Sequence, residues 1–256
     1  MKLSNNKIFI TGGSAGIGLA LAKRFVELNN KVIVTGRSES KLEEARQQCP
    51  QLETYVCDVS DTGSIGQLAL DLSKDHPDLN ALINNAGVYV ARNLTGSPED
   101  LAELAFEVEI NINGTVQTTA ALIDLIKKNK GTIINVSSGL AFVPLMAAPI
   151  YSATKAFVHS YTTSLRYQLA EVGVDVIELA PPAVRTDLTQ DLPDDGGFKI
   201  ITTDELVDAT MAGLKAGKKE IRPGQANQLK LMSRLAPDFV EGQLAKGSRD
   251  LVPESP

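Results

Sequence analysis

Short, nearly continuous apolar runs alternate with helix-length amphipathic stretches along this chain, and that alternation constrains its fold more than any other feature. The first two runs, Lys7–Thr11 and Lys31–Thr35, are rich in β-branched residues, and a helical stretch follows each of them. Strands that are buried on both faces have continuous apolar sequences, whereas half-exposed strands alternate with polar residues. The pattern therefore predicts a parallel sheet covered by helices on both faces.

The rest of the chain continues this alternation. Four more strand-like runs are Thr54–Cys57, Ala81–Asn84, Gly131–Val136 and Asp175–Leu179. Long helices are expected from about 98 to 128 and from about 151 to 172. Because crossovers between parallel strands are right-handed, we predict an α/β fold with a Rossmann-type, doubly wound parallel sheet of about seven strands in the order 3-2-1-4-5-6-7.

Length and composition limit the classes of protein to consider. The 256 residues contain neither an internal repeat nor a low-complexity linker, so we expect one domain over 1–256. The shares of hydrophobic (43%) and charged (22%) residues are typical of a soluble globular protein. The net charge of −6 disfavours a nucleic-acid partner. No stretch approaches the roughly 18 apolar residues of a membrane span, so no membrane partner is expected.

Cysteine and histidine are scarce. Cys49 and Cys57 are too few for a disulfide framework, which favours a reducing, cytoplasmic location. Together with His76 and His159 they show no metal-ligand spacing, so no metal site is expected.

A glycine-rich segment follows the first strand and opens the first helix. Glycines allow backbone N–H groups to approach a pyrophosphate, and the positive end of the helix favours its charge. The segment therefore predicts a dinucleotide site. The expected contacts in it are Gly12, Ser14, Gly16, Ile17 and Gly18.

The end of the second strand indicates which dinucleotide is bound. An acidic residue there would bind the ribose 2′-hydroxyl of NAD, whereas an arginine accommodates the 2′-phosphate of NADP. Thr35-Gly36-Arg37 contains no acid, and Arg37 offers a forked, permanently charged set of donors. We therefore expect NADP(H) to be preferred, with NAD(H) as the alternative.

Tyr151 and Lys155 stand four residues apart and so share one face of a helix. A tyrosine pKa near 10 is too high for an efficient base at neutral pH, and a neighbouring ammonium group is expected to lower it. Ser138 could hydrogen-bond a substrate oxygen on which charge develops. A Tyr-x-x-x-Lys pair alone is more often an ordinary surface pair.

Five motifs in order give the chain a specific resemblance to the short-chain dehydrogenase/reductase family, from the first strand through at least Thr186. They are Thr11–Gly18, Asn84–Gly87, Asn111–Gly114, Ser137-Ser138 and Tyr151–Lys155. The glycine spacing resembles the TGxxxGxG pattern of that family. The segment Glu220–Gly224 also resembles a bacterial subgroup named for its neighbourhood with teichoic-acid D-alanylation genes.

The resemblance implies roles for individual residues. Asn111 resembles the family's helix-kinking asparagine, whose carbonyl anchors a water in a proton relay from Lys155. Lys155 would also hold the nicotinamide ribose, and Thr186 would face the carboxamide. Asp58 resembles the residue beside adenine. Asn85 and Gly87 lie in the segment that steadies the sheet beside the adenosine ribose.

Two positions depart from the family pattern. Pro182 stands where family members usually have glycine, and proline fixes φ and removes an N–H, so the geometry near the nicotinamide could differ. Some NADP-specific members carry a basic residue inside the glycine turn, whereas this chain has Ser14 and Ala15 there.

A substrate loop is expected at about 187–204, because long loops in compact domains are often lids. The apolar segment Gly139–Met146, Val88 and Tyr89 would border the substrate cleft, although about half of these residues could simply pack in the core. Acidic residues in the loop disfavour a multiply anionic ligand. They are Asp187, Asp191, Asp194 and Asp195.

Apolar residues recur at helical spacing after Gly224, and packing on the sheet or against another subunit explains them better than a membrane surface does. Family resemblance implies a homodimer or homotetramer built on the helices near 98–128 and 151–172.

The sequence thus predicts an NADP(H)-dependent oxidoreductase that transfers a hydride between the nicotinamide and a small, moderately apolar carbonyl or secondary alcohol. Tyr151 would be the general acid or base, with Asn111, Ser138 and Lys155 as the other catalytic residues. Alternatives are a cofactor-dependent epimerisation or dehydration, and a regulatory protein that binds the nucleotide without turnover.

Overall fold

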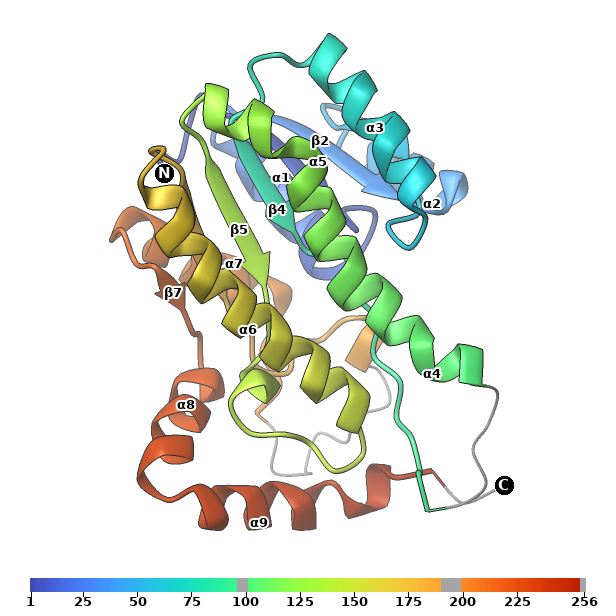
Figure 1. Cartoon of the computed structure of the whole chain (residues 1–256), viewed down its shortest axis with the longest axis vertical. Helices are drawn as coiled ribbons and strands as arrows, with labels where there is room; N and C mark the ends of the chain where they lie inside the picture. Colours follow the sequence, from blue (N-terminus) through green and yellow to red (C-terminus); the bar gives the residue numbers. More distant parts are fainter. Residues whose placement is uncertain (96–100, 190–198, 254–256) are drawn as a thin grey trace.

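The structure, a computed structural model, describes residues 1–95, 101–189 and 199–253. Its centre is one parallel sheet with the strand order β3-β2-β1-β4-β5-β6-β7, which confirms the predicted order (Figure 1). The strands are β1 (Lys7–Thr11), β2 (Lys31–Gly36), β3 (Glu53–Val56), β4 (Ala81–Asn84), β5 (Thr132–Val136), β6 (Asp175–Leu179) and β7 (Glu220–Ile221).

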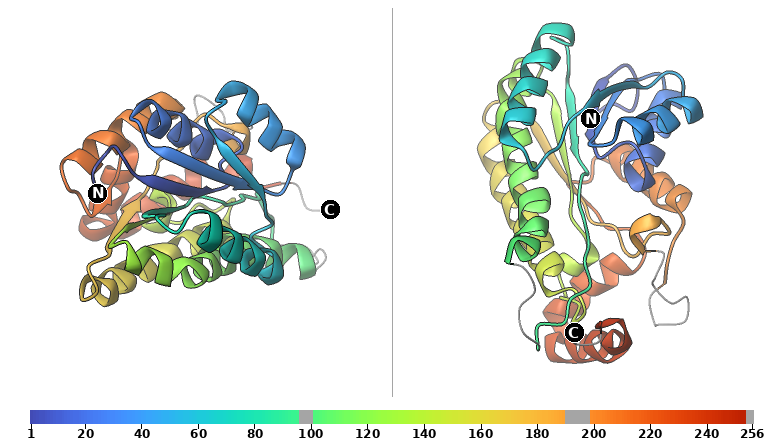
Figure 2. Two further views of the ribbon diagram at one scale, coloured as in Figure 1. Left: turned by 90° about the horizontal axis from the view of Figure 1, so that it is seen from above. Right: turned by 90° about the vertical axis from the view of Figure 1, so that its right-hand side faces the viewer.

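Helices cover both faces of the sheet, as Figure 2 shows. Side chains alternate along a strand, so Ile8 and Ile10 of β1 face one helical layer while Phe9 faces the other. The first layer contains α1 (Gly16–Glu27), α2 (Glu39–Gln48) and α7 (Thr203–Lys215). The second contains α3 (Thr62–Asp75), α5 (Thr115–Lys128) and α6 (Pro149–Ala170).

The predicted strand boundaries lie within one residue of the observed ones, and β2 ends and β5 begins one residue later than predicted. β4 and β6 begin and end at the predicted residues. β3 begins and ends one residue earlier than predicted. It is an edge strand whose Val56 is exposed, so burial on both faces does not mark its ends.

The helix predicted from 98 to 128 is interrupted. Its described part consists of α4 (Leu101–Val108), a π-helical turn (Glu109–Gly114) and α5, while residues 98–100 lie outside the described residues. A Cβ at Gly114 would lie 2.9 Å from the Val59 carbonyl oxygen, so glycine lets the helix approach the β3–α3 connection. π-helical turns of this kind are frequent at functional sites.

The predicted substrate loop is only partly described. A short 3₁₀ helix (Asp187–Thr189) follows Thr186, and residues 190–198 lie outside the described residues, with most of the expected lid and three of its four aspartates. The predicted end at residue 204 is wrong, because Thr202 caps α7 through a reciprocal capping box with Glu205.

The C-terminal apolar residues form two helices, α8 (Gln225–Leu235) and α9 (Pro237–Gly247). Pro237 ends the pattern of α8 and occupies the first turn of α9. Both helices lie beyond the carboxyl end of β5, at the bottom of Figure 1. They therefore cover the edge of the sheet at which ligands of doubly wound folds bind.

Candidate active site

The turn between β1 and α1 needs glycine at particular positions. Gly12 has a φ of +63°, and a Cβ on it would lie 2.9 Å from the Ala86 Cα. A Cβ on Gly18 would lie 2.3 Å from the Gly12 carbonyl oxygen. The turn is therefore closed by backbone contacts that no larger residue allows.

Side chains of Asn85, just after β4, and of Thr11, at the end of β1, hold this turn against the sheet. The Asn85 amide nitrogen donates to the carbonyl oxygens of Thr11 and Gly12, at 3.0 Å each. The Thr11 hydroxyl accepts the backbone N–H groups of Asn85 and Ala86. Asn84 links β4 to β5 and α5 through Asn135 and Thr119. The segment steadies the centre of the sheet, in the manner that the resemblance implied.

A cavity of about 320 Å³, which we call the glycine-turn cavity, extends from this turn to the carboxyl end of β5. Nine of the predicted cofactor contacts line it. They are Gly12, Ser14, Gly16, Ile17, Asn85, Gly87, Tyr151, Lys155 and Thr186.

Three predicted contacts, Gly18, Arg37 and Asp58, are not among the described residues that line this cavity. Gly18 serves the packing of the turn. Arg37 is exposed just beyond β2, close enough to Asp58 for its charge to lower the pKa of that carboxyl, after the larger effect of hydrogen bonds from Ser60. Both residues follow the carboxyl ends of neighbouring strands, β2 and β3.

Lys41 lines the cavity, and our sequence analysis did not identify it. It lies in the first turn of α2, where its backbone N–H bonds to the capping Ser38 hydroxyl. Its position four residues after Arg37 is the one signal in the sequence that could have suggested it.

The four predicted catalytic residues converge at the other end of the cavity. Lys155 is buried, and its Nζ donates to the Val136 carbonyl oxygen at 3.1 Å and lies 5.5 Å from the centre of the Tyr151 ring. Asn111 lies in the π-helical turn, where its amide bonds to both the N–H and the carbonyl of Val88. The Ser138 hydroxyl accepts the Leu140 N–H at 3.1 Å.

Burial sets the acid–base character of the pair. It raises the pKa of Tyr151 to about 12, and a hydrogen bond with the Ser138 hydroxyl partly opposes that rise. Burial also lowers the pKa of Lys155 to about 8. The sequence predicted a lowered pKa for Tyr151, and that direction is wrong here, because the loss of water around the phenolate outweighs the hydrogen bond with Ser138. At neutral pH the phenol is protonated, the form that donates a proton.

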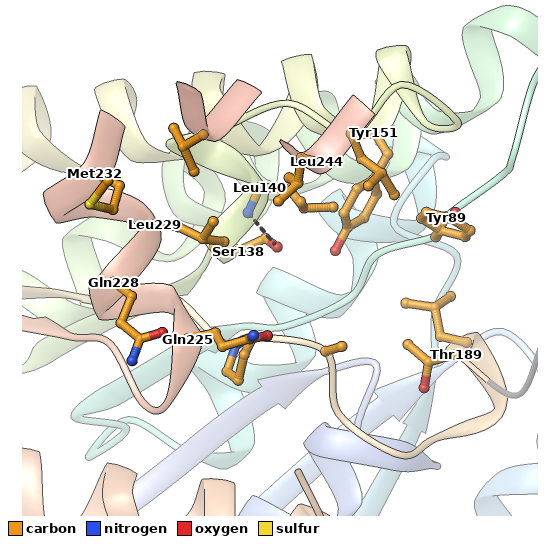
Figure 3. Close-up of a pocket in the computed structure, with 16 residues that line it drawn as sticks. Tyr89, Ser138, Leu140, Tyr151, Thr189, Gln225, Gln228, Leu229, Met232 and Leu244 are labelled. Carbon is orange, nitrogen blue, oxygen red and sulfur yellow. Dashed lines mark hydrogen bonds between the residues drawn. The ribbon is translucent and has the colours of Figure 1, made fainter. Parts of the chain in front are cut away.

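A second cavity, of about 240 Å³, which we call the apolar pocket, lies on the other side of Ser138 and Tyr151. Figure 3 shows Leu140, Leu229 and Leu244 around it, beside the Tyr151 hydroxyl. Its remaining wall comes mostly from small or apolar side chains. These are Tyr89, Gly139, Leu145, Pro182, Ala183, Leu188, Thr189, Met232 and Val240, with the amides of Gln225 and Gln228.

Only some of the residues expected to border the substrate cleft line the apolar pocket. Tyr89, Leu140 and Leu145 line the pocket, whereas Val143 is completely buried and Met146 is exposed. Our sequence analysis did not place α8 and α9 at this pocket. Their helical apolar spacing could have suggested a buried face, but not which cavity that face lines.

Pro182 separates the two cavities and lines both of them. The Gly139 N–H donates to the Pro181 carbonyl oxygen at 2.7 Å, which fixes the entry to this segment. A Cβ on Gly224, the residue before α8, would lie 3.6 Å from the Pro182 Cγ. The ring of Pro182 thus limits the space for a side chain at Gly224, on the α8 side of the pocket.

Comparison with known proteins agrees with this site. The short chain dehydrogenase family model matches residues 6–196, so the chain belongs to the short-chain dehydrogenase/reductase family of oxidoreductases. The chain is 45% identical over 224 residues to the uncharacterized oxidoreductase DltE of Bacillus subtilis (strain 168), covering 86% of this chain and 89% of the relative. The resemblance to that bacterial subgroup is thereby confirmed.

Solved structures share the whole fold. A short chain dehydrogenase from Burkholderia cenocepacia J2315, in complex with NADP, has a TM-score of 0.84 and 26% identity over 95% of this chain and 99% of its own. A short chain dehydrogenase/reductase from Burkholderia phymatum, in complex with NAD, has a TM-score of 0.80 and 20% identity over 95% and 96%.

The described residues contain neither a candidate membrane span nor a candidate metal site. None of their helices combines the length and apolar character needed to cross a membrane. In the same residues, no cluster of three or more histidine, cysteine or acidic side chains has a geometry that could hold a metal ion.

Proposed function

We propose that this oxidoreductase uses NADP(H) to transfer a hydride between the nicotinamide and a small, moderately apolar carbonyl compound or secondary alcohol. One observation carries the proposal. The glycine-turn cavity and the apolar pocket share Ser138 and Tyr151, so a cofactor in the first and a substrate in the second would meet at these two hydroxyl groups.

The glycine-turn cavity has the features that a dinucleotide requires. Gly12 and Gly16 adopt positive φ values that leave the backbone open to a phosphate, and α1 begins at Gly16 with its positive end toward the cavity. Lys155 at the far end would hold the ribose next to the nicotinamide, with Thr186 beside the carboxamide. A bound nicotinamide supplies or accepts the hydride.

The chain's own residues would handle the proton. Ser138 would donate a hydrogen bond to the substrate oxygen, since its hydroxyl already accepts the Leu140 N–H. Tyr151, whose raised pKa keeps it protonated, would donate its proton to that oxygen during reduction. The ammonium of Lys155 would then stabilise the phenolate, and Asn111 would anchor the water through which the proton is replaced.

The apolar pocket favours a neutral substrate of limited size. Lysine and arginine are missing from its described lining, so a phosphate or carboxylate would not find a charged partner there. An apolar cavity of roughly 150 Å³ holds benzene. By that measure a pocket of about 240 Å³ would take a group of roughly ten non-hydrogen atoms.

The preference for NADP(H) rests on two cations that follow β2 in the chain. Arg37 is exposed just after β2 and Lys41 lines the glycine-turn cavity, while β2 ends in Gly36 and not in an acid. The solved neighbours are in complex with NADP and with NAD, so they support a nicotinamide dinucleotide, and the choice between the two rests on these cations.

Paired fluorescence titrations with NADPH and NADH test the cofactor. Arg37→Gln is expected to weaken NADPH binding by roughly ten- to a hundredfold, the worth of a hydrogen bond to a charged group, and NADH binding by less than about twofold. Lys41→Gln should have a smaller effect of the same kind. Equal losses for both cofactors would show that Arg37 does not recognise the 2′-phosphate.

Turnover of a panel of neutral aldehydes and ketones then tests the reaction. Turnover of phosphorylated or acyl-carrier substrates alone would contradict the proposed substrate class.

We also propose a homodimer or homotetramer in the cytoplasm. The large apolar side chains Phe106 of α4 and Phe157 of α6 are exposed on the helices expected to form the interface, and Phe157 stacks on Tyr161. Both cysteines are buried free thiols, in keeping with a reducing compartment. Light scattering after Phe157→Ser tests the interface, and an unchanged oligomer mass would contradict it.

A further inference from the structure

A buried ion pair lies behind the wall of the apolar pocket, among residues to which the proposed mechanism gives no part. Glu107 of α4 is completely buried, and Arg92, in the connection after β4, is 7% exposed. The Arg92 Nε lies 3.6 Å from the Glu107 Oε2. A buried ion pair contributes little to the free energy of unfolding, because both charges lose their hydration. The pair therefore calls for a role other than stability.

Both members of the pair hold the segment that follows β4. The Glu107 Oε1 accepts the Val90 N–H at 3.2 Å. The Arg92 backbone N–H donates to the Ala147 carbonyl oxygen at 2.9 Å, and its Nη2 donates to the Glu103 carbonyl oxygen at 2.6 Å. The segment is therefore fastened to α4 on one side and to the 145–148 segment, part of the pocket wall, on the other.

Asn111 continues this attachment one helical turn later. It binds both backbone polar groups of Val88, and it is four residues after Glu107, on the same side of the helix. The backbone groups of Val88 and Val90 thus form hydrogen bonds with the side chains of Asn111 and Glu107. Side chains alternate along an extended segment, so the Tyr89 side chain lies on the opposite face from those of Val88 and Val90.

Tyr89 points at the catalytic tyrosine. The two rings meet edge to face, with centroids 5.2 Å apart and an interplanar angle of 74°. Tyr89 also lines the apolar pocket, as Figure 3 shows. Whatever fixes the backbone at Val88 and Val90 therefore fixes one wall of the pocket and one side of the Tyr151 ring.

We propose that the Glu107–Arg92 pair is a positioning device that holds Tyr89 against Tyr151 and so sets the shape and the electrostatics of the substrate site. The proposal rests on Tyr151 being the proton donor of the proposed function. Glu107 is a positioning residue, because it acts on the reacting groups through the Val88–Arg92 segment and through its charge.

The charges around Tyr151 agree with this role. Burial is the main cause of its raised pKa, and the charge of Glu107 raises it further, while Lys155 is the cation facing its ring. Glu107 likewise contributes to the raised pKa of Tyr89. Burial raises the pKa of Glu107 itself, and the guanidinium of Arg92 opposes that rise. A carboxylate at Glu107 therefore favours the protonated form of Tyr151.

The test compares Glu107→Gln with Glu103→Gln, which removes the same charge from an exposed side chain one turn earlier. Glu107→Gln is expected to raise KM for the carbonyl substrate by roughly tenfold, because the wall around the reacting atoms loosens. It should also move the pH profile of alcohol oxidation down by roughly half a pH unit, because a nearby negative charge is lost. Glu103→Gln should change neither, and equal behaviour of the two variants would overturn the proposal.

Arg92→Met/Glu107→Leu keeps the experiment decisive if Glu107→Gln fails to fold, because apolar replacement of both partners of a buried ion pair is often tolerated. Hydrogen exchange of the 88–92 segment should become at least roughly tenfold faster in this double variant, because Val90 loses its acceptor. A folded double variant with unchanged exchange and KM would show that packing alone positions Tyr89. If the unmodified protein reduces no carbonyl compound, the proposed function fails, whereas hydrogen exchange still decides the role of the pair.

Discussion

The glycine-turn cavity and the apolar pocket meet at Ser138 and Tyr151, yet they are built in opposite ways. The first is built around the glycine turn and polar side chains such as Asn85 and Lys155, and beside it a methyl group added at Gly18 would lie 2.3 Å from a carbonyl oxygen. The second is lined mostly by apolar side chains from segments between Tyr89 and Leu244 that lie far apart in the sequence.

This difference separates residues of this chain that tolerate few substitutions from residues that tolerate many. The Asn85 amide donates to the Gly12 carbonyl oxygen, and few other residues could replace such a contact, because buried polar groups need hydrogen-bond partners. An aliphatic wall has many solutions of similar volume. We therefore expect substitutions on the cofactor side to abolish binding, and those on the substrate side to change which substrate is accepted.

Tyr151 belongs to both cavities, and its loss should have the largest effect. Tyr151→Phe removes the proton donor and is expected to lower kcat by roughly 10²–10⁴-fold, the usual contribution of general acid catalysis. NADPH affinity should change by less than about threefold, since the ring is kept. Stopped-flow reduction and fluorescence titration measure the two quantities, and a parallel loss of both would make Tyr151 a structural residue.

Gly18→Ala tests the intolerance of the cofactor side. The added methyl group would press on the Gly12 carbonyl oxygen and should weaken NADPH binding by at least roughly tenfold, with a loss of about 1–3 kcal/mol in the free energy of unfolding. Titration and denaturant unfolding measure these changes. Gly66→Ala is the matched control, because a Cβ there has no neighbour within 4 Å. Equal NADPH affinity in the two variants would remove the basis for the comparison.

Leu229→Ala tests the tolerance of the substrate side. The change enlarges the apolar pocket next to Gly139, so kcat/KM for small ketones should fall by roughly three- to tenfold while bulkier ketones gain. NADPH affinity should stay within about twofold. A uniform loss for substrates of every size would mean that α8 supports the catalytic geometry and does not select the substrate.

The smallest expected effect concerns pH. Lys155 has a pKa lowered to about 8, so its ammonium is present below that pH and is lost as the pH rises through it. Since the cation would hold the cofactor ribose, the NADPH dissociation constant should rise by roughly threefold between pH 7 and 9. Lys155→Arg should flatten this dependence, because arginine stays charged. A pH dependence that survives this substitution would point to another group.

The sequence predicted the fold and nine of the residues that line the glycine-turn cavity, because both depend on local patterns. The apolar runs reproduced the bounds of β4 and β6, and the spacing of Tyr151 and Lys155 placed them on one face of α6. Glycine positions could be predicted because the need for a positive φ or a close backbone contact acts on single residues.

The lining of the apolar pocket and the place of Lys41 could not be predicted in this way. The apolar residues of α8 and α9 have a spacing that fits any buried helical face, so the sequence did not indicate that they line the pocket. Lys41 likewise resembles an ordinary surface lysine until α2 packs beside the glycine turn.

The sequence by itself determined the family, the doubly wound sheet and the residues that would move the proton, because their requirements are conformational and local. Only the tertiary structure decided that Tyr151 has a raised pKa, that α8 and α9 close the pocket, and that Glu107 pairs with Arg92 behind Tyr89. Desolvation and burial are sums over neighbours brought together from distant segments, and no short stretch of sequence contains those sums.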